Sequence, residues 1–75
     1  MNENSRDIIE YIIAFISEFA DKFGMTEPQA FNYIQQNKGI SFIEKHYNVI
    51  HTLSFADAVE NVALYCRRMG GEPLK

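Results

Sequence analysis

The sequence predicts an all-α fold in which about four helices form a small bundle with short connections. Two observations carry this prediction. Apolar residues recur every three or four positions over four segments of the chain, as expected for helices buried on one face. Helix start and stop signals separate these segments, and no segment shows the alternation of a strand. With 75 residues, we expect one helical domain over residues 1–75, with an ordered core from about residue 5 to 70 and short polar tails.

The first helix is expected from about Arg6 to Phe23, with Ser5 as its N-terminal cap and Gly24 as its C-terminal stop. One apolar stripe runs along this helix: Ile8, Ile12, Phe15, Ile16, Phe19 and Phe23. Ile9, Ile13 and Ala20 widen the stripe. A face this wide suits a helix with two neighbours, and in so short a chain one neighbour can belong to another subunit.

The second helix is short and is expected to end near Gln36. Thr26 and Gln29 form a capping box at its start, and Pro28 occupies the first turn, where its missing N–H costs nothing. Its apolar face is expected to contain Ala30, Phe31 and Ile34. After a turn at Asn37, Lys38 and Gly39, a third helix is expected from about Ile40 to a point between His46 and His51.

The fourth helix is expected to follow Ser54 as its N-cap, with Asp57 three residues later. Its stripe contains Phe55, Val59, Val62, Cys66 and Met69, and Gly70 and Gly71 end it. Leu64 lies opposite this stripe and has no evident partner within the chain.

The stretch HYNVIHTLSF, residues 46–55, raises the question of a chemical site. We interpret it mainly as the junction of the third and fourth helices, where His51, Thr52 and Ser54 satisfy free backbone groups. The candidate cluster, for either the junction or a contact surface, is Tyr47, His51, Thr52, Ser54 and Asp57.

Catalytic and metal sites have weaker support. His46 and His51 are five positions apart, so on a helix they point about 140° apart and cannot share a metal. Cys66 lies on an apolar stripe, where a cysteine serves as a small hydrophobic residue. We find no phosphate loop and no carboxylate pair. We therefore expect no enzyme, no cofactor and no metal.

Charge and composition restrict the classes of function that remain. The net charge is −3, which argues against nucleic acid as a partner. The segment from the second to the third helix could still mimic a helix-turn-helix, so a DNA-binding regulator is the alternative hypothesis. The single cysteine indicates a reducing, cytoplasmic location, and charged residues interrupt every apolar segment, which argues against a membrane span.

The segment from Phe42 to Gly71 resembles a family of small bacterial proteins, domain of unknown function 3791. The matching positions are Tyr47, Ile50, His51, Thr52, Asp57, Glu60, Arg67, Arg68 and Gly70. The resemblance implies a cytoplasmic helical protein without a recognised activity. It also implies a possible partner, because some members are encoded beside ADP-ribosyltransferase-like proteins.

Our leading hypothesis is a small helical module that binds proteins and self-associates, forming a dimer, binding another protein, or both. Its basis is apolar surface in excess of what a small core uses. The expected interface contains Tyr11, Ile9, Ile13 and Leu64, with Tyr33 and Phe42 as further candidates.

Overall fold

The computed structural model describes residues 3–72, with side chains from Arg6 onward, and all regular structure in this range is helical. The all-α prediction is confirmed. The outermost parts of the expected tails, residues 1–2 and 73–75, lie outside the described residues. The elements are α1 (Glu3–Phe23), α2 (Glu27–Gln36), α3 (Gly39–Lys45), α4 (Tyr47–Ile50) and α5 (Phe55–Arg68).

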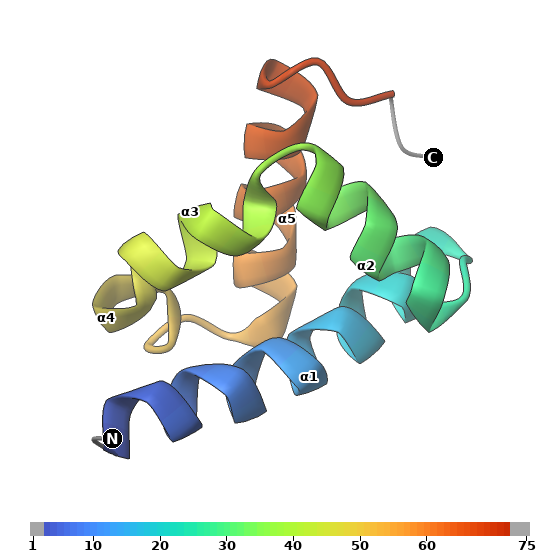
Figure 1. Cartoon of the computed structure of the whole chain (residues 1–75). Coiled ribbons are helices and arrows are strands. Elements are labelled where there is room, and N and C mark those ends of the chain that lie inside the picture. The colour runs from blue at the N-terminus through green and yellow to red at the C-terminus, as the bar shows by residue number, and fades with distance from the viewer. Residues whose placement is uncertain (1–2, 73–75) are drawn as a thin grey trace.

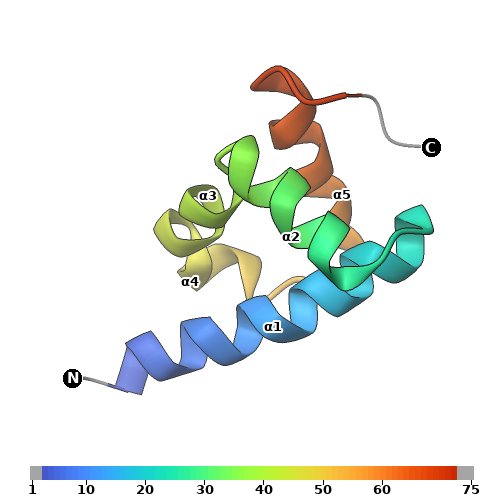
Figure 2. The same cartoon turned by 45° about the vertical axis from the view of Figure 1, so that its right-hand side comes forward.

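The helices cross one another at steep angles (Figure 1). α1 lies along one side of the molecule, and α5 runs across it. α2 turns back over the C-terminal part of α1, while α3 and α4 lie over the N-terminal part, as both views of the ribbon show (Figure 2). α1 contacts α2, α3 and α5, and α5 also contacts α2 and α3. This places one core between α1, α2, α3 and α5.

The core is built from the stripes that the sequence predicted. Its largest side chains are less than 2% exposed: Phe15, Phe19, Ile34, Ile43, Val59, Val62 and Cys66. Aromatic rings continue the core toward the end of α1, because Phe19 packs against Phe23 at 4.8 Å and against Tyr33 at 6.1 Å between ring centroids. Burial of these side chains is the main term that stabilises the fold.

Helix caps also follow the prediction. The Gln29 N–H donates to the Thr26 hydroxyl at 3.2 Å, and the Thr26 N–H donates to the Gln29 side-chain oxygen at 2.9 Å, which completes the capping box. The Asp57 N–H donates to Ser54 Oγ at 3.2 Å, so Ser54 caps α5. Gly24 ends α1 with φ of +65°.

One predicted boundary was wrong, and one break in a helix was not predicted. α1 begins at Glu3, so Ser5 lies inside the helix and does not precede it; acidic residues near a helix start, such as Glu3 and Asp7, favour this extension. The third predicted helix is divided at His46, whose ψ of 21° interrupts the helical backbone between α3 and α4.

The turn between α2 and α3 uses an unexpected residue. Lys38 has the positive φ of 64°, whereas Gly39 is buried at the start of α3. A Cβ on Gly39 would lie 2.6 Å from Ile34 Cγ2 and 3.0 Å from Cys66 Sγ. Glycine is therefore needed at this position for space rather than for backbone freedom.

Two apolar residues that we placed on buried faces are exposed. Phe31 is 38% exposed because α2 packs through Ala30 and Ile34, and Phe31 points about 100° away from Ala30. Met69 is 45% exposed because α5 ends at Arg68, one residue earlier.

Candidate interaction site

Aromatic rings hold the short helix α4 against α1 and α5. The Tyr11 ring meets the Tyr47 ring edge-on at 5.6 Å and stacks on the Phe55 ring at 5.3 Å. The Tyr11 hydroxyl also approaches the Ile50 carbonyl oxygen at 3.5 Å, and burial raises the Tyr11 pKa. Tyr11 is therefore half-buried and packs within this junction, and its place in an apolar interface stays a prediction.

The polar residues of the candidate cluster form hydrogen bonds with the backbone at this junction. His51 Nδ1 lies 2.7 Å from the Tyr47 carbonyl oxygen, and its ring stacks on the Tyr47 ring at 4.7 Å. The Thr52 hydroxyl donates to the Val49 carbonyl oxygen at 2.6 Å. With Ser54 bonded to the Asp57 N–H, these side chains close one helix and start the next.

Cys66 and His51 lie in different environments. The thiol of Cys66 is buried, and burial raises its pKa to about 11, so it carries little of the reactive thiolate at neutral pH. His51 is exposed at the end of α4. Among residues 3–72, no group of three His, Cys, Asp or Glu side chains is arranged to hold a metal ion.

The exposed face of α3 has no excess of positive charge. Ser41, Glu44 and Lys45 face solvent, so one carboxylate offsets one ammonium group. Phe42 is not available for contacts, because its ring stacks on Tyr65 at 4.3 Å. A recognition helix would need cations for phosphates and donors for base edges. α2 and α3 are therefore connected as in a helix-turn-helix, but the exposed face of α3 does not have the excess of positive charge that DNA binding needs.

Three of the four residues expected in an apolar interface are exposed. Ile9 is 56% exposed, Ile13 64% and Leu64 51%. Tyr33 and Phe42, the further candidates, are partly buried against the core. Val49 on α4 is also 64% exposed and was missed, because it lies in a segment too short to show a helical period.

The exposed isoleucines belong to a face of α1 that is covered only at one end. Ile9, Ile13, Ile16 and Ala20 lie on one side of the helix, since they are spaced by three or four residues. Ala20 is 3% exposed, whereas Ile13 is 64% exposed. α2 covers the C-terminal part of this face and leaves the N-terminal part open (Figures 1 and 2).

Leu64 forms a second, separate surface on α5. It lines a shallow groove of about 210 Å³ together with Lys22, Phe23, Glu60, Ala63 and Arg67. Lys22 and Phe23 are at the C-terminal end of α1, about 14 Å or more along the helix from Ile13. We call Ile9 and Ile13, with Arg6 and Glu10 beside them, the α1 patch, and Leu64, with Glu60, Arg67 and Arg68 beside it, the α5 patch.

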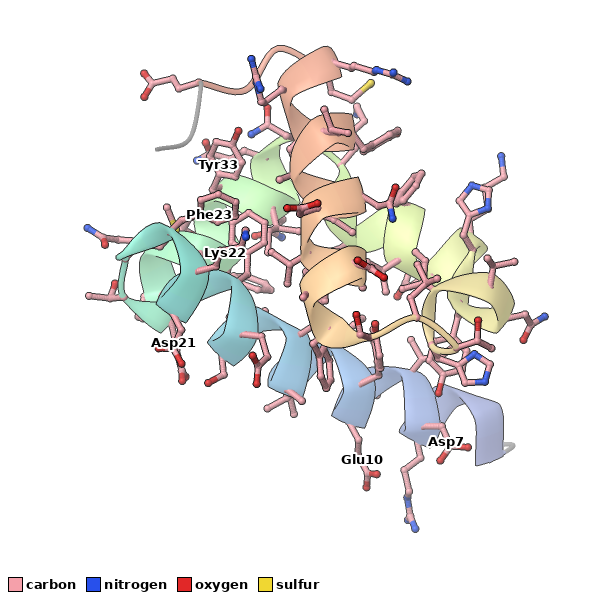
Figure 3. All side chains as sticks on the ribbon, turned by 180° about the vertical axis from the view of Figure 1, so that it is seen from behind. Asp7, Glu10, Asp21, Lys22, Phe23 and Tyr33 are labelled. Carbon is pink, nitrogen blue, oxygen red and sulfur yellow. The ribbon has the colours of Figure 1, made fainter. Side chains whose placement is uncertain are left out.

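Charged side chains of both signs lie beside the α1 patch. Four exposed carboxylates lie on α1, those of Asp7, Glu10, Glu18 and Asp21. Two of them, Glu10 and Asp21, extend from the side of α1 that faces away from the other helices (Figure 3). Of the two cations on the described part of α1, Lys22 approaches Glu60 of α5 at 3.7 Å, which leaves Arg6 beside the patch.

These features define a class: a small all-helical protein with two separate areas of exposed apolar surface, each flanked by charged side chains of both signs. No helix within the described range is long and apolar enough to cross a membrane. The family model described as "Protein of unknown function (DUF3791)" matches residues 10–68, well over half of the chain. The chain therefore belongs to this family, as the resemblance predicted. Comparison with curated proteins and with solved structures gives no match.

Proposed function

We propose that this protein is a helical protein-interaction module that self-associates, and that the α1 patch is a surface it uses. The observation that carries the proposal is the exposure of Ile9 and Ile13, at 56% and 64%. Isolated apolar side chains on a surface are ordinary. Two isoleucines one turn apart, on a face that is buried further along the same helix, form a continuous apolar strip of the kind that marks contact surfaces.

The size of the protein supports an interaction role over catalysis. A small chain has little interior in which to enclose a substrate, and the hollows on its described surface, of about 210, 320 and 420 Å³, are shallow and open. The binding of another protein requires only an exposed surface with an apolar centre and a polar rim. The α1 patch supplies both, with its isoleucines and the charged side chains of Arg6 and Glu10.

The test is the solution mass of the purified protein, measured by light scattering over a concentration series. We expect the native mass to rise above the monomer value of 8.7 kDa as concentration increases. Ile13→Lys should stay monomeric, because it places a charge at the centre of the strip. Val49→Lys is the matched control, since Val49 is equally exposed, at 64%, and lies on α4.

Circular dichroism of each variant should show native helix content. A native protein that stays at 8.7 kDa at every concentration would contradict self-association. The α1 patch would then be available for a different protein, and an ADP-ribosyltransferase-like neighbour, which the family resemblance suggests, would be the first to test by co-purification.

A further inference from the structure

We infer that residues 70–72, which we call the strap, form a gate that opens while the helices stay folded and that controls solvent access to the Cys66 side chain. The strap follows α5 and lies at the opposite end of the molecule from the N-terminal half of α1 (Figures 1 and 2). The inference therefore goes beyond the proposed function and does not depend on self-association.

Hydrogen bonds rather than apolar contacts hold the strap. The Gly71 N–H donates to the Cys66 carbonyl oxygen at 2.9 Å, and the Tyr33 hydroxyl donates to the Glu72 carbonyl oxygen at 2.7 Å. Gly70, with φ of +102°, turns the chain at the end of α5. The strap has no apolar side chain to bury, and Gly70 and Glu72 are exposed. A segment attached in this way opens locally at low free energy.

The closed position of the strap is nevertheless specific. A Cβ on Gly71 would lie 2.8 Å from the Tyr33 hydroxyl oxygen and 2.8 Å from Asn37 Nδ2, so the strap approaches α2 as closely as a glycine allows. Asn37 Nδ2 in turn donates to the Tyr33 carbonyl oxygen at 2.8 Å. The strap also borders an open hollow of about 420 Å³, which leaves it space to move when these contacts break.

Tyr33 connects the strap to the surroundings of the Cys66 thiol. Cys66 is 0% exposed, although it lies only two positions before Arg68, the last residue of α5. On one side, a Cβ on Gly39 would lie 3.0 Å from its Sγ. Tyr33 is also a neighbour, since burial and the Cys66 thiol raise the pKa of Tyr33. When the strap opens, both the Cys66 carbonyl and the Tyr33 hydroxyl lose their partners, and the cover over the thiol loosens.

The test is the rate at which the thiol reagent DTNB labels Cys66 at mildly alkaline pH, with the thiol serving as the reporter of the gate. Tyr33→Phe removes the bond to Glu72 and keeps the ring, so labelling should be about 2- to 10-fold faster than in the native protein. Gly71→Ala, which displaces the strap from Tyr33, should also accelerate labelling. Tyr65→Phe is the matched control and should keep the native rate, because it removes a hydroxyl from a ring that stacks on Phe42 of α3.

Two further measurements distinguish a gate from unfolding of the whole chain. Labelling through the gate should hardly change at low urea concentration, because opening exposes little surface, whereas labelling through global unfolding rises steeply with urea. Hydrogen exchange of the Gly71 amide, followed by NMR, should give the same opening constant as the labelling.

Three results would overturn the inference. The first is a native labelling rate in both Tyr33→Phe and Gly71→Ala, with native helix content by circular dichroism. The second is a labelling rate that follows global unfolding at every urea concentration. The third is fast exchange of the Gly71 amide in a protein whose Cys66 is labelled only through global unfolding, since the strap would then move without controlling access to the thiol.

Discussion

The two halves of α1 have the same apolar periodicity but different surroundings. In the C-terminal half, Phe15 and Phe19 are fully buried and Ala20 is 3% exposed, whereas in the N-terminal half Ile9 and Ile13 are more than half exposed. Both halves have a wide apolar face with the same helical period. The comparison shows that periodicity identifies which side of a helix is apolar, while the lengths of the neighbouring helices decide how much of that side is buried.

The neighbours of α1 explain the difference. α2 has 10 residues, so it spans about 15 Å, roughly half the length of α1. The helix near the other half, α4, has 4 residues and contacts α1 through the rings of Tyr11 and Tyr47. The N-terminal half is therefore covered on one side only, and its isoleucines remain on the surface.

The largest expected difference between the two halves of α1 comes from truncating one large side chain in each. Phe19→Ala should lower the free energy of unfolding by about 3–5 kcal/mol, because it leaves a cavity in the core. Ile13→Ala should lower the free energy of unfolding of the monomer by less than about 0.5 kcal/mol, as expected for an exposed site. Urea denaturation at low protein concentration, followed by circular dichroism, measures both. Equal losses would mean that both halves are packed alike.

A second substitution adds volume to the packed region. Gly39→Ala should lower the free energy of unfolding by about 1–3 kcal/mol, since its methyl group would overlap Ile34 and Cys66. The matched control is the double variant with Cys66→Ala, which opens space beside the new methyl group. Part of the Gly39→Ala effect should disappear in that background. A fully additive double variant would show that the two sites do not share this space.

A smaller effect is expected from pH, and it reports only on the packed region. Burial raises the Cys66 pKa from 9.0 to about 11 in the folded chain, so above pH 9 the unfolded chain loses this proton first. The folded state then binds more protons, and stability falls as pH rises from about 9 to 11, by up to about 2 kcal/mol. Tyr11 and Tyr33, whose pKa values burial also raises, add to the fall.

Denaturation curves at pH 8 and pH 10 would measure this fall. Cys66→Ala should show a shallower dependence on pH than the native protein, whatever its stability at pH 8. The same slope in both proteins would assign the whole effect to the tyrosines.

Most of the fold could be predicted from local signals. The capping box at Thr26 and Gln29 and the Ser54 cap are interactions within four residues, so the sequence contains both partners. The core stripes were equally readable, because burial of an apolar face has a helical period. The break in the helix at His46 could not be predicted from local signals, because it accompanies the packing of α4 against Tyr11, a residue far away in the chain.

The candidate surface was predicted in part, for a related reason. Ile9, Ile13 and Leu64 were identified as exposed because they exceed what a small core uses, and the structure exposes all three. The packing of Tyr11 inside the chain was not predicted, because its partners, Tyr47 and Phe55, come from distant segments. The separation of Leu64 from the isoleucines depends on the path of α5 across α1, which no local pattern contains.

Two tyrosines join each end of the last helix to an earlier part of the chain. The Tyr11 hydroxyl reaches the Ile50 carbonyl just before α5, and the Tyr33 hydroxyl donates to the Glu72 carbonyl just after it, each across 39 residues. Closing a loop of that length costs about 3 kcal/mol of chain entropy, whereas α1, α2 and α3 pack as consecutive neighbours. We therefore expect α5 to dock after α1, α2 and α3 have packed, and its docking to bring the segments on both sides of α5 into place together.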